Sequence, residues 1–261
     1  MRRRREPVVN PPRTPPFANH FGPQAEQYVE YRPHYPAALF HHLAIAAGGT
    51  GLAWDCATGN GQAAVGLAER FARVAATDAS ADMIAQAKPH ARVTYQVAMY
   101  ESGLPDRSAN LVTVAQALHW LDLDALMREV RRVLVPGGLF AAWCYPLCRI
   151  DPRVDEVVDL FYRITLGPFW PPERRHTEDG YRSLVLPLVE MPAPPLEMKE
   201  DWSMPQFLHY VSTWSGVRKC VAARGEAPFQ AFGDALRERW GSPTLRRTVR
   251  WPLLFRMGRV T

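Results

Sequence analysis

Two acidic residues stand directly after apolar runs, and small residues follow the first of them. Asp55 ends the run "LAWD", and Ala57, Gly59 and Gly61 come next in "WDCATGNGQAA". Asp78 ends a second run, "RVAATD". Glycines permit positive φ angles and a close approach of the backbone to a ligand. An acidic residue after the second strand is placed to hold both hydroxyls of a ribose. The pattern therefore predicts a turn that binds a nucleoside-containing ligand.

The charge of Asp55 favours one kind of ligand over another. A turn that binds a dinucleotide would contain G-x-G-x-x-G, whereas "GNGQAA" has Ala64 at the third glycine, a common replacement. An anionic side chain just before the turn repels a pyrophosphate and suits a cationic group, such as an amino-acid ammonium. An oxidoreductase that uses a dinucleotide is therefore the disfavoured alternative.

The elements that must position these residues alternate between strand and helix. Apolar runs predict strands over 52–56, 73–78, 92–98, 109–118 and 139–145. Helical spacing predicts helices over 36–47, 61–71, 80–88 and 122–134, with Ser80 as an N-cap. This alternation predicts an α/β fold with a doubly wound parallel sheet.

After the fifth predicted strand the pattern changes. Residues 151–240 are predicted to form a helical cap, and 244–260 a final strand in which Pro252 indicates an edge position or a bulge. We expect a disordered basic, Pro-rich tail over 1–20 and a single domain over 21–261.

Composition and charge argue against several function classes. The formal net charge is +5, but the opening "MRRRRE" supplies much of the excess, so the folded body is nearly balanced and no nucleic-acid partner is expected. No apolar run approaches the roughly 20 residues of a membrane span. Four cysteines, at positions 56, 144, 148 and 220, show no familiar zinc spacing, so we expect no metal and reduced, mostly buried thiols in a cytoplasmic protein.

The ordered set of motifs resembles one superfamily. "WDCATGNGQAA", "ATDASADMIAQA" and "LVTVAQALHWLDLDALMREVRRVLVPGGLFAAW" are similar to motifs of class I methyltransferases, which use S-adenosylmethionine. "YRPHYP", "AQALHW" and "STW" resemble the branch that includes trans-aconitate-type and other small-molecule methyltransferases. The resemblance implies a Rossmann-like, seven-stranded sheet whose last strand is antiparallel, with the fourth-strand loop facing the methyl group.

The resemblance also implies a set of cofactor contacts. Asp78 would hold the ribose diol, Met83 would pack on the adenine, and the backbone of Gln116 would approach the methionine moiety. Arg32, in a lid over 21–36, would pair with the methionine carboxylate; a surface salt bridge is the alternative. The predicted cofactor-binding residues are Tyr28, Arg32, Asp55, Ala57, Gly59, Gly61, Asp78, Ala79, Met83, Ala98, Met99, Glu101 and Gln116.

The acceptor pocket is predicted from aromatic and imidazole side chains. His119 would position the acceptor or act as a base, although "HW" can equally be a packed pair, and Trp214 can equally belong to the core. The predicted pocket residues are His34, His119, Trp120, Tyr145 and Trp214. Arg174, Arg175 and His176 are expected in a solvated loop, with attraction of an acidic substrate as the alternative.

These inferences predict an enzyme that transfers a methyl group from S-adenosylmethionine to an oxygen or nitrogen of a small soluble molecule, leaving S-adenosylhomocysteine. A carboxylate or a specialised metabolite is the candidate acceptor, and the expected state is a monomer or a homodimer. The alternative is a non-catalytic cofactor-binding or regulatory protein. Two departures favour it: Ala57 replaces the first glycine, and Asn110 stands where the family often has Asp, near the floor of the site. Because alanine forbids only strained φ values, we expect the turn to bind nonetheless.

Overall fold

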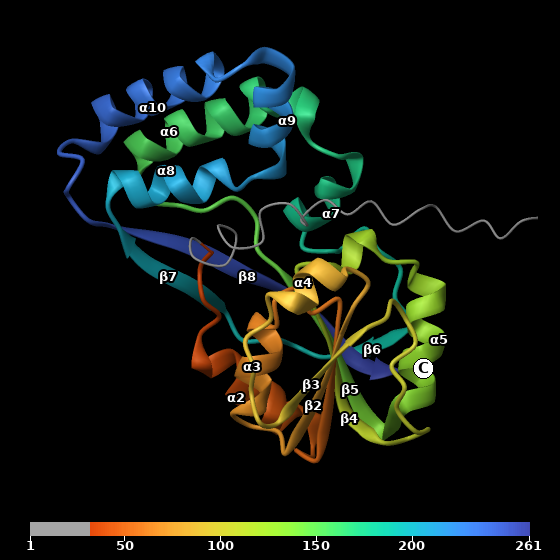
Figure 1. Ribbon diagram of the computed structural model, residues 1–261. Helices are drawn as coiled ribbons and strands as arrows, with labels where there is room; N and C mark the ends of the chain where they lie inside the picture. Colours follow the sequence, from red (N-terminus) through yellow and green to blue (C-terminus); the bar gives the residue numbers. More distant parts are fainter. Residues whose placement is uncertain (1–31) are drawn as a thin grey trace, which may run out of the picture.

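A parallel β-sheet forms the centre of the computed structural model, which describes residues 32–261 (Figure 1). Each predicted apolar run forms a strand of it, in the order β3-β2-β1-β4-β5. The strands are β1 (Leu52–Cys56), β2 (Arg73–Asp78), β3 (Val93–Val97), β4 (Ala109–Ala115) and β5 (Leu134–Cys144). Because the strand order reverses between β1 and β4, the carboxyl ends of these two strands mark the place where such sheets bind ligands.

Three further strands complete the sheet. The path continues from β5 to β8 (Arg247–Val260) and β6 (Leu188–Glu190), and both pairings that β8 makes on this path are antiparallel. This confirms the Rossmann-like fold with seven strands and an antiparallel last strand. An eighth strand, β7 (Leu196–Trp202), pairs with the first half of β8. Pro252 lies in that half, which does not pair with β5, and so occupies the expected edge position.

Helices cover both faces of the sheet. Along β5, alternate side chains enter two different cores: Leu139 and Trp143 belong to one, and Phe140 and Cys144 to the other. The first core is closed by α2 (Ala37–Ala47) and α3 (Gln62–Ala68), and the second by α5 (Leu123–Val133). The short α4 (Ala81–Ala85) follows β2 and starts where expected, since Ser80 Oγ accepts a hydrogen bond from the Met83 N–H.

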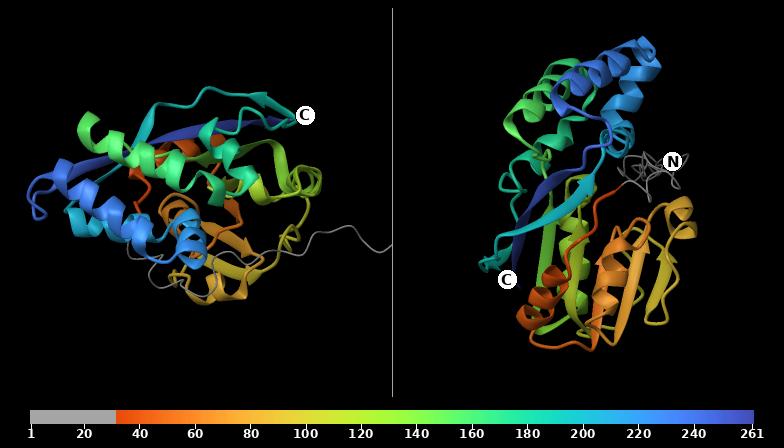
Figure 2. Two further views of the ribbon diagram at one scale, coloured as in Figure 1. Left: turned by 90° about the horizontal axis from the view of Figure 1, so that it is seen from above. Right: turned by 90° about the vertical axis from the view of Figure 1, so that its left-hand side faces the viewer.

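A group of helices stands beyond the carboxyl end of the sheet (Figure 2). This cap contains α6 (Pro152–Leu160), α8 (Met204–Ser212), α9 (Ser215–Arg224) and α10 (Ala227–Trp240). Single turns lead from α6 back to the sheet: η3 (Phe161–Thr165), η4 (Gly167–Phe169), η5 (Pro172–Arg174) and α7 (Arg175–Glu178). The range predicted to be helical therefore also contains β6 and β7, which the pattern did not indicate.

Stacked aromatic rings fix the cap to the sheet. Phe161 and Phe232 stack with ring centroids 4.1 Å apart inside the cap. Trp251 of β8 packs on Trp202 of β7 and donates from its indole N–H to the Tyr210 hydroxyl of α8, at 3.0 Å. The long β7–β8 ribbon therefore shares one core with the helices and holds the cap over the ends of the strands.

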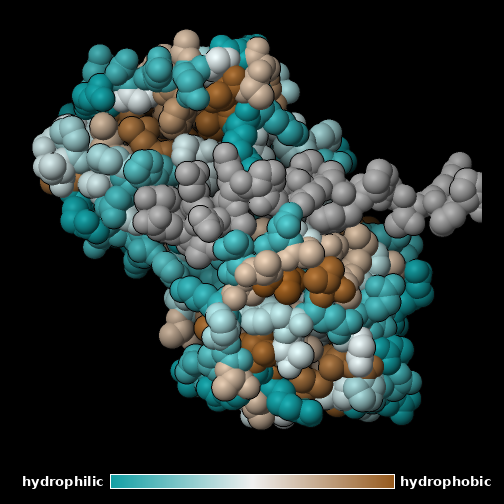
Figure 3. Space-filling view, viewed as in Figure 1, coloured by the Kyte–Doolittle hydropathy of each residue, from teal (hydrophilic) through white to brown (hydrophobic). Residues whose placement is uncertain are grey.

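The surface of the described residues is mixed. On the face drawn in Figure 3, hydrophobic residues gather on the cap helices and around α4. No helix among residues 32–261 is long and apolar enough to span a bilayer. The four cysteines are free and buried.

The structure corrects the placement of Asn110. It is the second residue of β4, so it lies at the opposite end of the strand from the ligand-binding edge. Its Oδ1 accepts hydrogen bonds from the N–H groups of Gly51 (3.0 Å) and Leu52 (3.2 Å), which ties the entry of β1 to β4. Asn110 is thus a structural residue, and its amide has no bearing on the floor of the site.

We expect Asn110→Ala to lower the free energy of unfolding by about 1–2 kcal/mol, because two backbone donors lose their acceptor. Urea unfolding measures this cost. Affinity for the cofactor that the resemblance implies should not change. Weaker cofactor binding at unchanged stability would return Asn110 to the site.

Candidate active site

The turn after β1 has a left-handed backbone at three positions. The φ angles are 55° at Ala57, 59° at Gly59 and 81° at Gly61. Hydrogen bonds hold the turn in place: the Thr58 N–H donates to the Thr77 carbonyl at 2.9 Å, and the Gly61 N–H to the Thr58 carbonyl at 3.0 Å. The tight turn predicted between β1 and α3 is therefore formed.

Ala57, which stands in place of the first glycine of the expected motif, has a left-handed backbone. Its φ of 55° is one of the strained values that a Cβ disfavours, so the alanine takes up a disfavoured conformation rather than avoiding it. A left-handed residue with a Cβ costs roughly 1–2 kcal/mol. The turn keeps its shape in spite of the substitution, so Ala57 gives no reason to think that the site has been lost.

The two glycines leave room for neighbouring side chains as well as for backbone geometry. A Cβ on Gly61 would lie 2.2 Å from the Tyr95 hydroxyl, and a Cβ on Gly59 would lie 3.3 Å from Cε of Met83. Met83 is buried at 6 % exposure, against the turn. Sequence reasoning missed this steric role, since nothing in "GNG" names the side chains that fill the space.

Asp55 of β1 is fully buried and bonds both the turn after β1 and the neighbouring strand β4. Its Oδ2 accepts from the Thr58 hydroxyl at 2.6 Å, and its Oδ1 accepts from the Thr113 hydroxyl of β4 at 2.7 Å. Burial raises the pKa of Asp55 to about 6, and the threonine hydrogen bonds partly offset this. The two threonines were not predicted; the signal for Thr113 is a single hydroxyl within the apolar run "ANLVTVA".

Asp78 is held at the end of β2 by two backbone donors. Its Oδ2 accepts from the Gly59 N–H at 2.8 Å, and its Oδ1 from the Ser80 N–H at 2.8 Å. Burial raises the pKa of the carboxyl, and these two hydrogen bonds oppose the rise. Each carboxylate oxygen keeps a second lone pair. The structure thus joins the predicted turn and the predicted ribose-binding acid, with Ala79 next in the chain.

The segment after β3 lies beside this acid. The Ala98 N–H donates to the Asp78 carbonyl at 2.9 Å. The Met99 carbonyl accepts from the Cys56 thiol at 3.6 Å. Ala98 and Met99 therefore reach the carboxyl ends of β2 and β1, as the adenine side of the predicted site requires.

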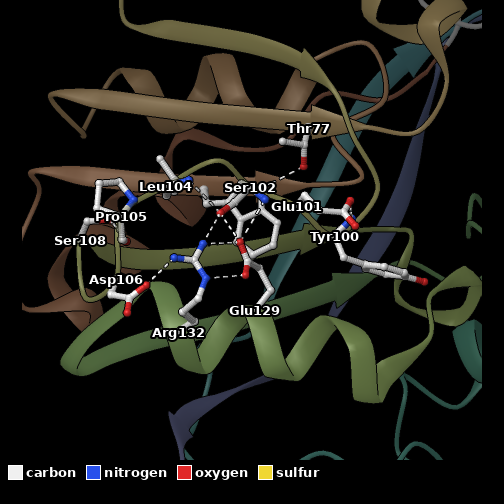
Figure 4. A network of polar contacts seen from close by, with 11 residues as sticks. Thr77, Tyr100, Glu101, Ser102, Leu104, Pro105, Asp106, Ser108, Glu129 and Arg132 are labelled. Atoms are coloured by element: carbon white, nitrogen blue, oxygen red, sulfur yellow. Dashed lines mark hydrogen bonds and ion pairs between the residues drawn. The ribbon is translucent and has the colours of Figure 1, made fainter.

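Glu101 stands at the edge of an ion-pair network (Figure 4). Arg132 of α5 bonds Asp106 at 2.6 Å and Glu129 at 2.7 Å, and Glu129 accepts from the Ser102 hydroxyl. The Arg132 hydrogen bonds lower the pKa of Glu129 to about 2. The network fixes the loop on α5, whereas Glu101 itself is exposed.

Gln116 joins the ends of β4 and β5. Its side-chain Oε1 accepts from the Tyr145 N–H at 2.8 Å, and its Nε2 donates to the Tyr145 carbonyl at 3.3 Å. Its φ is 56°, a second left-handed residue with a Cβ at this edge. The side chain is thus occupied by the protein, which leaves the backbone as the part that can approach a ligand.

His119 lies in the turn η2 (Leu118–Trp120) that follows β4, and it is a neutral side chain. Burial, together with the charges of Arg174 and His176, lowers the pKa of His119 to about 3. Its Nδ1 lies 3.2 Å from the hydroxyl of Tyr181, which is fully buried and accepts a hydrogen bond from the Leu118 N–H.

Tyr181 sets the tautomer of His119. Because a buried hydroxyl hydrogen needs an acceptor, Tyr181 donates to Nδ1, and the proton of the neutral ring is then on Nε2. Nε2 has no partner among the described residues and is not buried. His119 therefore offers an N–H donor, which argues against the base that was one of its two predicted roles. Sequence reasoning missed Tyr181, which is distant in the chain.

Three other predicted pocket residues have different surroundings: Trp120, Tyr145 and Trp214. Trp120 is 36 % exposed and packs on the His119 ring, with centroids 4.5 Å apart, so the packed pair is present. The Tyr145 hydroxyl accepts from Nη1 of Arg32 at 3.2 Å, between the sheet and the cap. Trp214 is buried among aromatic rings of the cap, which fits its alternative reading as core.

His34 is placed apart from this pocket. It is exposed, and its Nδ1 lies 3.0 Å from the Glu200 carboxylate of β7. The arrangement is a surface contact between the segment before α2 and the β7–β8 ribbon, so the structure does not bring His34 beside His119 and Trp120. Tyr28 and lid residues 21–31 lie outside the described residues. Among residues 32–261 no group of three His, Cys, Asp or Glu could hold a metal ion.

The sheet order, the turn and the paired acid define a class of protein, the class I methyltransferases. A family model described as a methyltransferase domain matches residues 54–142. A putative methyltransferase of Dictyostelium discoideum is 30% identical over 212 residues, which cover 79% of this chain and 81% of that protein. The solved structure of a putative type II methyltransferase from Anaeromyxobacter dehalogenans is 48% identical and covers 88% of this chain and 98% of that chain, with a TM-score of 0.84.

The chain therefore belongs to the methyltransferase family and is an enzyme that depends on S-adenosylmethionine. A methyltransferase of Aspergillus candidus, 27% identical over 88% of this chain and 82% of its own length, agrees with this assignment. The narrower resemblance to the trans-aconitate-type branch stays a prediction.

We expect Asp55→Asn to change the pH dependence of stability. A carboxyl whose pKa is raised to about 6 in the folded state favours the protonated form, so its stabilising effect is present below about pH 4 and is lost as the pH rises through 6. The asparagine variant lacks this loss. Relative to the wild type, its free energy of unfolding should rise between pH 4.5 and 7.5, by up to about 3 kcal/mol. Urea unfolding at both pH values measures the difference, and an equal difference at both would contradict the buried charge.

We expect Tyr181→Phe to allow both tautomers of the neutral His119 ring. In the wild-type protein, ¹⁵N NMR should show a neutral ring protonated on Nε2 down to about pH 4. The variant should show a mixture of tautomers, because Nδ1 has lost its donor. Tyr210→Phe, which removes a buried hydroxyl that bonds Trp251 and not His119, is the control. An unchanged imidazole spectrum in Tyr181→Phe would exclude the proposed hydrogen-bond direction.

Proposed function

We propose that the protein transfers the methyl group of S-adenosylmethionine to an oxygen or nitrogen of a small molecule. The observation that carries the proposal is the Asp78 carboxylate, which two backbone N–H groups orient beside the glycine turn while each oxygen keeps a free lone pair. A ribose diol offers two hydroxyl donors at matching spacing. The residues present therefore fit the group.

Each part of the cofactor has a counterpart in the site. Asp78 would hold the diol, and the backbone at Gly59 and Gly61 would follow the methionine moiety. The buried charge of Asp55 favours a cationic ammonium near the turn, although Thr58 and Thr113 take its direct hydrogen bonds. Met83, Ala79, Ala98 and Met99 would surround the adenine. Arg32, whose guanidinium contacts Tyr145 and lies 5.6 Å from the Tyr210 ring centroid, would meet the methionine carboxylate.

The protein's own contribution to the reaction is alignment and exclusion of water. When bound, S-adenosylmethionine supplies an electrophilic methyl group and its own leaving group. The cap and the β4 loop would enclose the acceptor, and the aromatic rings of Trp120 and Tyr145 favour a cationic centre. His119 would orient the acceptor through its Nε2–H.

The neutral state of His119 restricts the acceptor. With Nδ1 bonded to Tyr181 and Nε2 protonated, the ring has no free lone pair for a proton. An oxygen acceptor must then already be anionic, as a carboxylate is, whereas a neutral amine attacks with its own lone pair. A phenol would need another base. We further expect a monomer or homodimer with no nucleic-acid partner.

The alternative, a non-catalytic cofactor-binding or regulatory protein, loses its two supporting observations. Ala57 keeps the turn in its left-handed shape, and Asn110 lies at the far end of β4. Incubation with labelled S-adenosylmethionine and a panel of carboxylic acids, phenols and amines separates the two functions. Binding without transfer to any of them would favour the regulatory protein.

We expect Asp78→Ala to weaken binding of S-adenosylhomocysteine by about 1–3 kcal/mol, the range for hydrogen bonds to a charged group. Calorimetry measures the affinity. Asp78→Asn, which keeps the shape of the side chain, should show part of the loss. Asp124→Asn, on the exposed first turn of α5, is the matched control and should bind like the wild type. Equal affinities in all four proteins would refute the cofactor site.

A further inference from the structure

Arg174 stands out from the rest of its loop. It ends η5 and is half-buried, whereas its neighbour Arg175 is exposed. The guanidinium carbon lies 4.3 Å from the ring centroid of Trp170 and 5.2 Å from that of Tyr162. Its Nε donates to the Tyr162 hydroxyl. The expectation of a solvated loop holds for Arg175 but not for Arg174.

Trp170 and Tyr162, the two aromatic residues that hold Arg174, are themselves fixed by further contacts. The Trp170 indole N–H donates to the Tyr162 carbonyl at 3.0 Å. A Cβ on Gly216 of α9 would lie 3.0 Å from the Trp170 ring, so the absence of a side chain there lets the indole pack closely. The Tyr162 hydroxyl donates to Glu178 at 2.6 Å. Few side-chain rotamers are therefore open to the arginine.

No carboxylate of residues 32–261 lies within ion-pair distance of Arg174. The nearest acid in its hydrogen-bond chain is Glu178, which is separated from the guanidinium by the Tyr162 hydroxyl and offsets its charge only in part. Among the described residues the terminal Nη1 and Nη2 groups have no hydrogen-bond partner, and neither is buried. A guanidinium held by its Nε and its face keeps this outer pair of N–H groups for a forked contact.

Arg174 also borders the predicted acceptor site. The turn η5 packs against η2, which carries His119 and Trp120. Arg174 is the largest charge effect on the pKa of His119, which it lowers. An anion bound beside η2 would therefore find a cation and the Nε2–H donor of His119 on one side.

We infer that Arg174 forms an anion subsite of the acceptor pocket and that the methyl acceptor carries a carboxylate. This inference rests on the proposed function. It favours a carboxylate because the forked N–H pair of a guanidinium matches the two oxygens of that group. It also agrees with a site in which His119 has no lone pair free to take a proton from an acceptor oxygen.

The test compares matched pairs of ligands on the protein loaded with S-adenosylhomocysteine. Phenylacetate and phenylacetamide, and a longer pair such as 4-phenylbutanoate and its amide, differ only in charge and forked acceptor geometry. The wild type should bind the carboxylate of at least one pair at least tenfold more tightly than the amide. In Arg174→Gln this ratio should fall to about two or less. Arg175→Gln, at the exposed neighbour, should keep the wild-type ratio.

Two further measurements guard against a purely structural effect. Arg174→Lys keeps the charge but loses the fork, so its ratio should lie between those of the wild type and the glutamine variant. In the wild type, the ¹⁵N signal of the Arg174 guanidinium should shift on addition of the bound carboxylate and not of its amide. This second readout needs no variant to fold.

The possible failures can be told apart. If S-adenosylhomocysteine does not bind, the proposed function fails as well. If it binds but no carboxylate is preferred, or if the preference persists in Arg174→Gln, only the anion subsite is refuted. A preference for inorganic phosphate over every carboxylate tested, lost in Arg174→Gln, would also overturn the carboxylate assignment.

Discussion

The buried carboxylate of Asp55 connects the parts of the structure on which the site depends. In the sheet, Asp55 lies opposite Ala76 of β2 and Thr113 of β4. Its two oxygens accept from the hydroxyls of Thr113 and Thr58, and the carboxylate also accepts from the backbone of Ala64, so one buried charge ties β4, the turn and the start of α3 together. In the same turn, the Gly59 N–H donates a hydrogen bond to the Asp78 carboxylate. Burying a carboxylate costs stability, and the hydroxyls offset part of that cost.

The acidic and the basic side chains near the site lie on different elements. Asp55 and Asp78 lie at the carboxyl ends of the adjacent strands β1 and β2. Arg32 contacts Tyr145 after β5, and Arg174 lies in η5, which packs against η2. The neutral His119 lies in η2, next to η5. Under the proposed function, Asp55 and Asp78 would face the cationic, ribose-bearing cofactor and Arg32 would meet its carboxylate. Arg174 would be left for an anionic acceptor.

The sequence allowed prediction where one strand or turn decided the outcome. The strands could be read from continuous apolar runs, and Asp55, Gly59 and Asp78 could be grouped because parallel strands end at one edge. Contacts between distant segments could not be read in this way. Tyr181 contacts His119 although 62 positions separate them in the chain, and Glu200 of β7 contacts His34. The strand β7 escaped notice because its sequence, "LEMKEDW", is half-exposed and follows a Pro-rich link.

Two of the four described residues that combine a Cβ with a positive φ lie at the same edge as the site; the other two are Arg107 and Tyr181. Ala57 and Gln116 follow the adjacent strands β1 and β4, and both have left-handed φ angles of 55° and 56° in spite of their Cβ atoms. Such strain persists only where the surroundings impose it. At Ala57 the Asp55–Thr58 hydrogen bond holds the turn; at Gln116 two hydrogen bonds to Tyr145 do so. The hydrogen bonds that hold the turn after β1 therefore offset the cost of a left-handed alanine at the point where the strand order reverses.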